Sequence, residues 1–147
     1  MFFLKELPTK QMIDGYAGRY PIKSADTVEK ALIMMRQASL LVRQIETYFS
    51  SFGISQLRFL ILVVIDREPE RDNLLVSEIS DRIDVSRPVI TRTLQSLTRD
   101  KLIVIKADNS DGRAKQVSLT EKGRELLQEI LPGYYAVIDT FMGTLEA

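Results

Sequence analysis

Residues 86–99 bring together side chains that can hydrogen-bond to nucleic acid. On a helical wheel, Ile90, Leu94 and Leu97 lie within about 60° of one another, which predicts the buried side of a helix. The opposite side carries mostly polar residues: Pro88, Arg92, Gln95, Ser96 and Arg99. Arginine and glutamine can make bidentate hydrogen bonds to guanine and adenine edges, each contributing about 1–3 kcal/mol of discrimination. We therefore expect this face to contact DNA bases, and the alternative is an ordinary solvated surface.

The start of this predicted helix offers a second kind of contact. Ser86 is a favoured N-cap residue, and Pro88 suits a first turn, where its missing N–H costs nothing. Backbone N–H groups at a helix N-terminus are good phosphate donors. We expect this N-terminus, with Ser86 and the adjacent Arg87, to contact the DNA backbone.

A turn-rich segment further along the chain carries more basic residues. Residues 108–112 (Asp-Asn-Ser-Asp-Gly) are typical of a tight turn, and Arg113 and Lys115 follow them. A basic residue on a projecting hairpin can enter a minor groove, where narrow A·T-rich DNA has the most negative potential. In a second interpretation Arg113 pairs with Asp108 or Asp111 across the turn, and both interpretations can hold together.

The charge distribution agrees with a DNA-binding segment. The net charge is zero, but residues 86–116 carry seven basic and three acidic side chains, a net charge of +4. Residues 55–85 and residues 117–147 each carry a net charge of −3. A concentrated positive stretch matches a phosphate backbone, although a solvated basic face would have the same composition.

Several kinds of chemistry are disfavoured by what the sequence lacks. There is no cysteine and no histidine, so disulfides, thiolate zinc sites and the usual general bases are missing. Glu68 and Glu70 flank Pro69 in a polar loop, and a solvated loop is favoured over paired catalytic carboxylates. Residues 108–119 do not fit a calcium loop, because glycine is fifth instead of sixth and Leu119 is twelfth. We expect no enzyme, no cofactor and no metal.

The elements that position these residues follow from hydrophobic periodicity and capping. A long helix is predicted from Ser24 or Asp26 to about Ser51, ended by Gly53. The next helices are predicted over residues 55–67, 76–83 and 86–99, with a loop at 68–73. Two short helices joined by a tight turn are a helix-turn-helix.

The period then changes from 3.6 to 2. Residues 102–106 and 116–119 predict a β-hairpin, and Thr120 can cap a further helix. Pro132-Gly133 is predicted to break or kink that helix before a last helical stretch, and residues 1–23 are predicted to be irregular. The predicted fold is mainly α with a small β-hairpin wing, a winged helix-turn-helix flanked by N- and C-terminal dimerisation helices.

Three stretches resemble the MarR family of bacterial winged-helix regulators: Val85–Arg92, the wing Asp111-Gly112-Arg113, and Val117–Gly123 with its Leu-Thr-x-x-Gly pattern. Met1–Pro8 also resembles the start of one branch of the family. The resemblance implies a homodimer with two recognition helices on a pseudo-palindromic DNA site. It places Arg87, Pro88, Thr91 and Arg92 at recognition-helix positions and Arg113 at the wing tip.

Three departures from the family pattern change the expected geometry. Asp84 and Lys101 stand where glycine is common, so we expect both junctions to bend differently. The chain stops at Ala147, where relatives commonly continue into another helix. We therefore expect the long first helix and residues 134–145 to carry more of the dimer interface.

These observations predict three regions. They are an N-terminal arm and dimerisation helix (1–54), a winged helix-turn-helix DNA-binding domain (55–120) and C-terminal dimerisation helices (121–147). The predicted function is a sequence-specific regulator of transcription, a homodimeric repressor whose release by a small-molecule effector is left open. The alternative is a winged-helix protein-interaction module that does not bind DNA specifically.

Two further expectations concern location and ligands. The longest apolar run, Phe59–Ile65, is far shorter than the roughly 20 residues of a membrane span, and no signal-peptide core is seen, so we expect a cytoplasmic protein. The tyrosines could line a small-molecule cavity, but core or interface packing is the favoured interpretation. They are Tyr16, Tyr20, Tyr48, Tyr134 and Tyr135.

Overall fold

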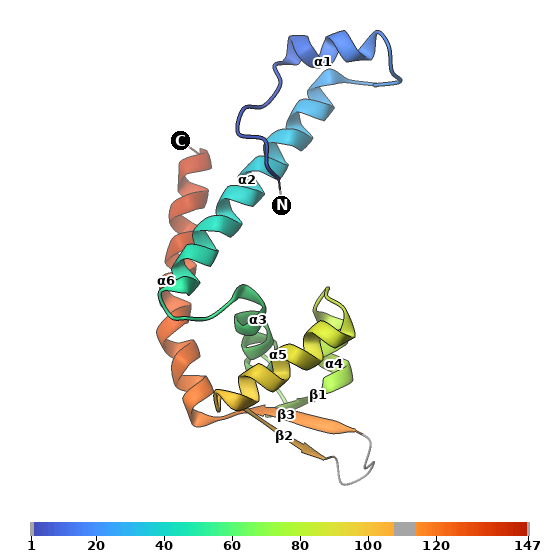
Figure 1. Cartoon of the computed structure of the whole chain (residues 1–147). Helices are drawn as coiled ribbons and strands as arrows, with labels where there is room; N and C mark the ends of the chain where they lie inside the picture. Colours follow the sequence, from blue (N-terminus) through green and yellow to red (C-terminus); the bar gives the residue numbers. More distant parts are fainter. Residues whose placement is uncertain (1, 108–113, 147) are drawn as a thin grey trace. The chain divides into compact units, whose positions relative to one another are not determined.

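The computed structural model describes residues 2–107 and 114–146 (Figure 1). Its helices and strands are α1 (Lys10–Ala17), α2 (Ala25–Ser50), α3 (Gln56–Asp66), β1 (Asn73–Leu75), α4 (Val76–Arg82), α5 (Arg87–Arg99), β2 (Ile103–Ala107), β3 (Lys115–Leu119) and α6 (Glu121–Glu146). They form two compact units, an N-terminal unit of residues up to 45 and a C-terminal unit from residue 46 onward.

The N-terminal unit contains a helix that the sequence did not predict. Thr9 caps α1, since its hydroxyl accepts a hydrogen bond from the Met12 N–H at 3.2 Å, and Ile13 is buried. The expectation of an irregular segment was wrong because Gly15 lies inside the helix instead of breaking it. The start of α2 agrees with prediction, because the Ser24 hydroxyl accepts from the Thr27 N–H at 3.4 Å.

The C-terminal unit is built on a three-stranded antiparallel sheet in the order β1-β3-β2. Val117 of β3 lies opposite Leu74 of β1 and Ile105 of β2. The predicted hairpin is therefore present, but β1 was missed, since three residues are too few to show a period-2 pattern. The largest fully buried side chains of this unit include Phe59, Ile61, Leu62, Leu74, Ile79, Ile90, Leu97, Ile103, Val117, Leu127 and Ile130.

The helix ends of this unit agree with the predicted caps. Gly53 has a left-handed backbone with φ of 66° after α2, and the Ser55 hydroxyl accepts from the Arg58 N–H at 3.2 Å. At the start of α6, the Thr120 hydroxyl accepts from the Gly123 N–H at 3.0 Å. Each cap satisfies a backbone group that a helix end leaves without an intrahelical partner.

Of the two alternatives predicted at Pro132-Gly133, the break is wrong, because α6 continues through both residues as one helix, and the kink stays a prediction. Proline removes one helical N–H donor. Near it, the Tyr48 hydroxyl donates to the Ile130 carbonyl at 2.7 Å. A Cβ at Gly133 would lie 2.2 Å from that hydroxyl oxygen, so glycine permits the close approach. These two contacts pack the middle of α6 closely against Tyr48 of α2.

Candidate DNA-binding surface

The position of α5 is set by the turn that joins it to α4 and by the burial of one side of the helix. Ile83 ends α4 in extended backbone, and the Ser86 carbonyl accepts from the N–H groups of Val89 and Ile90, both at 3.1 Å. Ser86 occupies the predicted N-cap position, although its hydroxyl makes no capping hydrogen bond among the described residues. Ile90, Leu94 and Leu97 are at most 2% exposed, which confirms the predicted core side of the helix.

The opposite side of α5 presents most of the predicted DNA-contacting residues to solvent. The exposed members are Ser86, Arg87, Pro88, Thr91, Arg92, Gln95 and Arg99. Ser96 was expected among them but is half-buried, and it lines a groove with Ser55 and Arg58 of the α3 start. A single-helix wheel could not predict this packing of α3 against one edge of α5.

A second groove joins α5 to the hairpin. It has a volume of about 300 Å³, and the predicted contact residues Arg87, Thr91, Gln95 and Lys115 are among its lining residues. The structure thus gathers side chains from α5 and from β3 on one concave surface. The predicted wing residues Asp111 and Arg113 lie outside the described residues.

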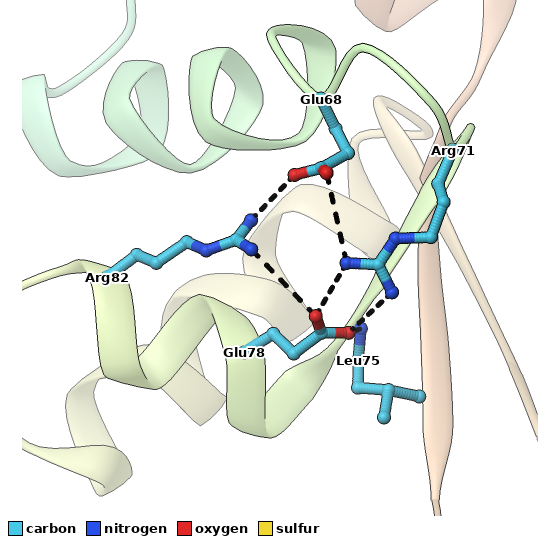
Figure 2. A network of polar contacts seen from close by, with 5 residues as sticks. All are labelled: Glu68, Arg71, Leu75, Glu78 and Arg82. Carbon is cyan, nitrogen blue, oxygen red and sulfur yellow. Dashed lines mark hydrogen bonds and ion pairs between the residues drawn. The ribbon is translucent and has the colours of Figure 1, made fainter.

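A network of ion pairs joins α4 to the segment between α3 and β1 (Figure 2). Glu78 accepts from Arg71 at 2.6 Å and from the Leu75 N–H at 3.0 Å, which caps the start of α4. Arg82 pairs with Glu68 at 2.9 Å and with Glu78 at 3.9 Å. The Arg71 guanidinium and the Leu75 N–H together lower the pKa of Glu78 to about 2.

This network was missed by sequence reasoning. Glu68 was assigned to a solvated loop, but it pairs with Arg82 and lies 4.0 Å from Arg71. The spacing of Glu78 and Arg82, four residues apart on a predicted helix, was the available signal. Within the described part of the chain, no group of three or more acidic side chains is placed to hold a metal ion.

The two glycine-to-other departures have different outcomes. Lys101 has a φ of 62°, and among the described non-glycine residues only Lys101 lies in the left-handed region. The expectation of a different bend was therefore wrong at Lys101, which keeps the left-handed geometry that glycine usually provides. Asp84 does not have a left-handed backbone. No helix in the described ranges has the length and apolarity that crossing a membrane would require.

A helix-turn-helix followed by a β-hairpin, with a polar recognition face, defines a winged-helix protein. The sequence model of the MarR family matches residues 52–114. The transcriptional repressor YetL of Bacillus subtilis is 29% identical over 140 residues, which cover 95% of this chain and 83% of YetL. The chain is therefore similar to MarR-family proteins over its winged helix-turn-helix, and to a transcriptional repressor over nearly its whole length.

Solved structures agree on the fold. AbsC, a MarR-family regulator of Streptomyces coelicolor, superposes with a TM-score of 0.76 at 22% identity, over 88% of this chain and 85% of AbsC. Sco3205 of the same organism, solved in complex with DNA, gives 0.73 at 19% identity over 84% and 76% of the two chains. The predicted winged helix is therefore confirmed.

Proposed function

We propose that this protein is a sequence-specific DNA-binding repressor of transcription that acts as a homodimer on a pseudo-palindromic operator. In the proposed complex, α5 lies in the major groove and the hairpin reaches the flanking minor groove. The contact residues on and before α5 are Ser86, Arg87, Pro88, Thr91, Arg92, Gln95 and Arg99. Those of the wing are Asp111, Arg113 and Lys115.

One observation carries this proposal: α5 is apolar on the side that packs and polar on the side that is exposed. Its buried side consists of aliphatic residues, whereas Arg92 and Gln95 on the other side are exposed and one turn apart. Arginine and glutamine provide paired donors and acceptors that match base edges. Lys115 shares a groove with Gln95, so the wing strand extends the same surface.

The assignment as a repressor rests on the relatives, and the assignment as a homodimer rests on what the resemblance to the MarR family implies. YetL is named a repressor, and Sco3205 was solved with DNA. In our proposal the regions outside the winged helix supply the dimer contacts, namely residues 1–54 and 121–147, with residues 55–120 binding DNA. Two copies then present their α5 helices to half-sites about one helical turn apart, 10–10.5 base pairs.

The test is binding of the purified protein to DNA from upstream of its own gene, compared with an unrelated duplex. We expect Arg92→Ala to weaken specific binding about tenfold to one-hundredfold, because it removes a base-edge contact. Arg124→Ala is the matched control, since Arg124 is an exposed arginine on α6 that lies 3.8 Å from Glu121.

Equal losses in both arginine variants would contradict the assignment of α5 as the recognition helix. Wild-type protein that binds both duplexes equally would favour the alternative, a winged helix used for protein interaction. A dimer-sized complex and protection of two half-sites by footprinting would support the homodimer.

A further inference from the structure

The C-terminal end of α5 closes with a motif that usually needs glycine. The Lys101 N–H donates to the Thr98 carbonyl at 3.0 Å, and the Leu102 N–H donates to the Leu97 carbonyl at 3.0 Å. These two bonds, with a left-handed residue between the helix and Leu102, are a Schellman motif. Lysine is costly at that left-handed position, so neighbouring structure must hold it.

The first turn of α6 supplies that support, because three successive carbonyls after α5 accept hydrogen bonds from it. The Thr120 hydroxyl donates to the Lys101 carbonyl at 2.7 Å, and the Thr120 N–H donates to the Leu102 carbonyl at 3.1 Å. The Lys122 ammonium donates to the Asp100 carbonyl at 3.0 Å. The end of α5 and the start of α6 thus form one hydrogen-bonded corner (Figure 1).

The packing at this corner leaves no room for a side chain at one position in the first turn of α6. Gly123 is buried, and a Cβ there would lie 2.2 Å from the Leu102 carbonyl oxygen. The obstacle is backbone and cannot rotate away. On the other side of the corner, the Asp100 carboxylate accepts a hydrogen bond from Arg58 of α3. The α5–β2 turn is therefore held between two helices.

Thr120 is the centre of this corner, because one hydroxyl serves two elements. Its oxygen accepts from the Gly123 N–H at 3.0 Å, which caps α6, and its hydrogen goes to the Lys101 carbonyl. Any shift of the first turn of α6 relative to the end of α5 must stretch one of these bonds. The recognition residues Gln95 and Arg99 lie in the last two turns of α5, next to the corner.

We propose that Thr120 is a positioning residue for base recognition: through the Lys101 carbonyl it fixes the C-terminal half of α5 relative to α6. The proposal rests on the proposed DNA-binding function and deepens it. It makes α6 a part of the recognition geometry, so that displacement of the α6 start changes how α5 meets the bases.

The test compares Thr120→Val, which keeps the shape and removes the hydroxyl, with Thr120→Ser, which keeps the hydroxyl. Both are measured well below their melting temperatures, so that loss of folded protein does not contribute. We expect Thr120→Val to bind operator DNA about tenfold more weakly and to bind an unrelated duplex as the wild type does. Thr120→Ser should restore operator binding, whereas a role in stability alone would weaken binding to neither duplex.

A measurement without DNA separates this proposal from the proposed function. In Thr120→Val we expect faster amide hydrogen exchange at Lys101 and Leu102, and unchanged exchange at Leu94 in the middle of α5. If the wild type shows no operator preference but this exchange change occurs, the DNA function fails while the corner stands. Unchanged exchange at Lys101 and Leu102, or wild-type operator binding by Thr120→Val, would overturn the positioning role.

Discussion

At the scale of single residues, one lysine in the described chain has the left-handed backbone that side chains other than glycine rarely adopt. Lys101 has a φ of 62° at the end of α5, where glycine would have no Cβ penalty. We expect Lys101→Gly to raise the free energy of unfolding by about 1 kcal/mol, as measured by urea denaturation. Gly53→Ala is the mirror experiment, because Gly53 has a φ of 66° and should lose a similar amount.

A decrease in stability for Lys101→Gly would contradict this account of the αL position. Such a loss would mean that the lysine side chain and the lower entropy of its unfolded chain together outweigh the cost of its left-handed backbone.

Residue-level prediction succeeded where one helix decides burial and failed where two helices meet. The 3.6-residue period correctly placed Ile90, Leu94 and Leu97 in the core, because all three lie on the side of α5 that packs. Ser96 was misplaced because α3 covers it, and a helical wheel contains no information about a neighbouring helix. Lys101 was identified only through its departure from a family pattern.

At the scale of elements, the ion-pair network behind α4 makes stability depend on pH. The pKa of Glu78 falls from an ordinary 4.5 to about 2, chiefly through the Arg71 hydrogen bond. A carboxylate with a lowered pKa stabilises the fold above its unfolded pKa, and this contribution is lost as the pH falls toward 2. We expect the wild type to lose stability between about pH 5 and pH 2 more steeply than Glu78→Gln.

The neutral variant should be about 1 kcal/mol less stable at pH 7, because an amide keeps the cap on the Leu75 N–H but loses the charge. Thermal unfolding across this pH range measures both effects. Parallel stability curves for the two proteins would show that Glu78 contributes nothing as an anion.

A second element-level prediction concerns the continuous α6. Gly133→Ala should destabilise the protein by about 1–3 kcal/mol, because its Cβ would lie 2.2 Å from the Tyr48 hydroxyl oxygen. Gly143→Ala in the same helix is the matched control. Nothing lies within 4 Å of its Cβ position, so it should be neutral or stabilising by up to about 1 kcal/mol. Chemical denaturation measures the free energy of unfolding of both variants. Equal changes in this free energy would exclude a specific contact at Gly133.

The features that sequence analysis mispredicted have different causes. β1 is only three residues long and exists because Leu74 pairs with Val117 of β3, far along the chain. The break predicted as one alternative at Pro132 is absent, because α6 is continuous there, and the other alternative, a kink, stays a prediction. α1 was hidden by nearby glycine and proline residues, although Thr9 is a good cap. Local signals predict helices well when capping and periodicity coincide, and poorly when distant contacts decide.

At the scale of the whole molecule, the fold class and the resemblance to the MarR family were both available from the sequence. The change of period after residue 101 predicted a hairpin behind a helix-turn-helix, and the structure has β2 and β3 there. The basic stretch 86–116 lies in a chain of zero net charge, and its described residues fall on α5, β2 and the start of β3. The three-region division and the individual DNA contacts stay predictions, because each depends on a partner, either DNA or a second copy.

The salt dependence of DNA binding tests the central claim most directly. The wild-type protein is titrated onto its own upstream DNA and onto an unrelated duplex between 50 and 200 mM salt. Over this range, a protein that makes six phosphate contacts loses about 10³-fold or more in affinity, so the salt slope reports the phosphate contacts. The difference in affinity between the two duplexes reports the base contacts. We predict a steep negative salt slope on both duplexes and about 1,000-fold or greater preference for the upstream DNA. Equal affinity for the two duplexes at every salt concentration would contradict base recognition by α5.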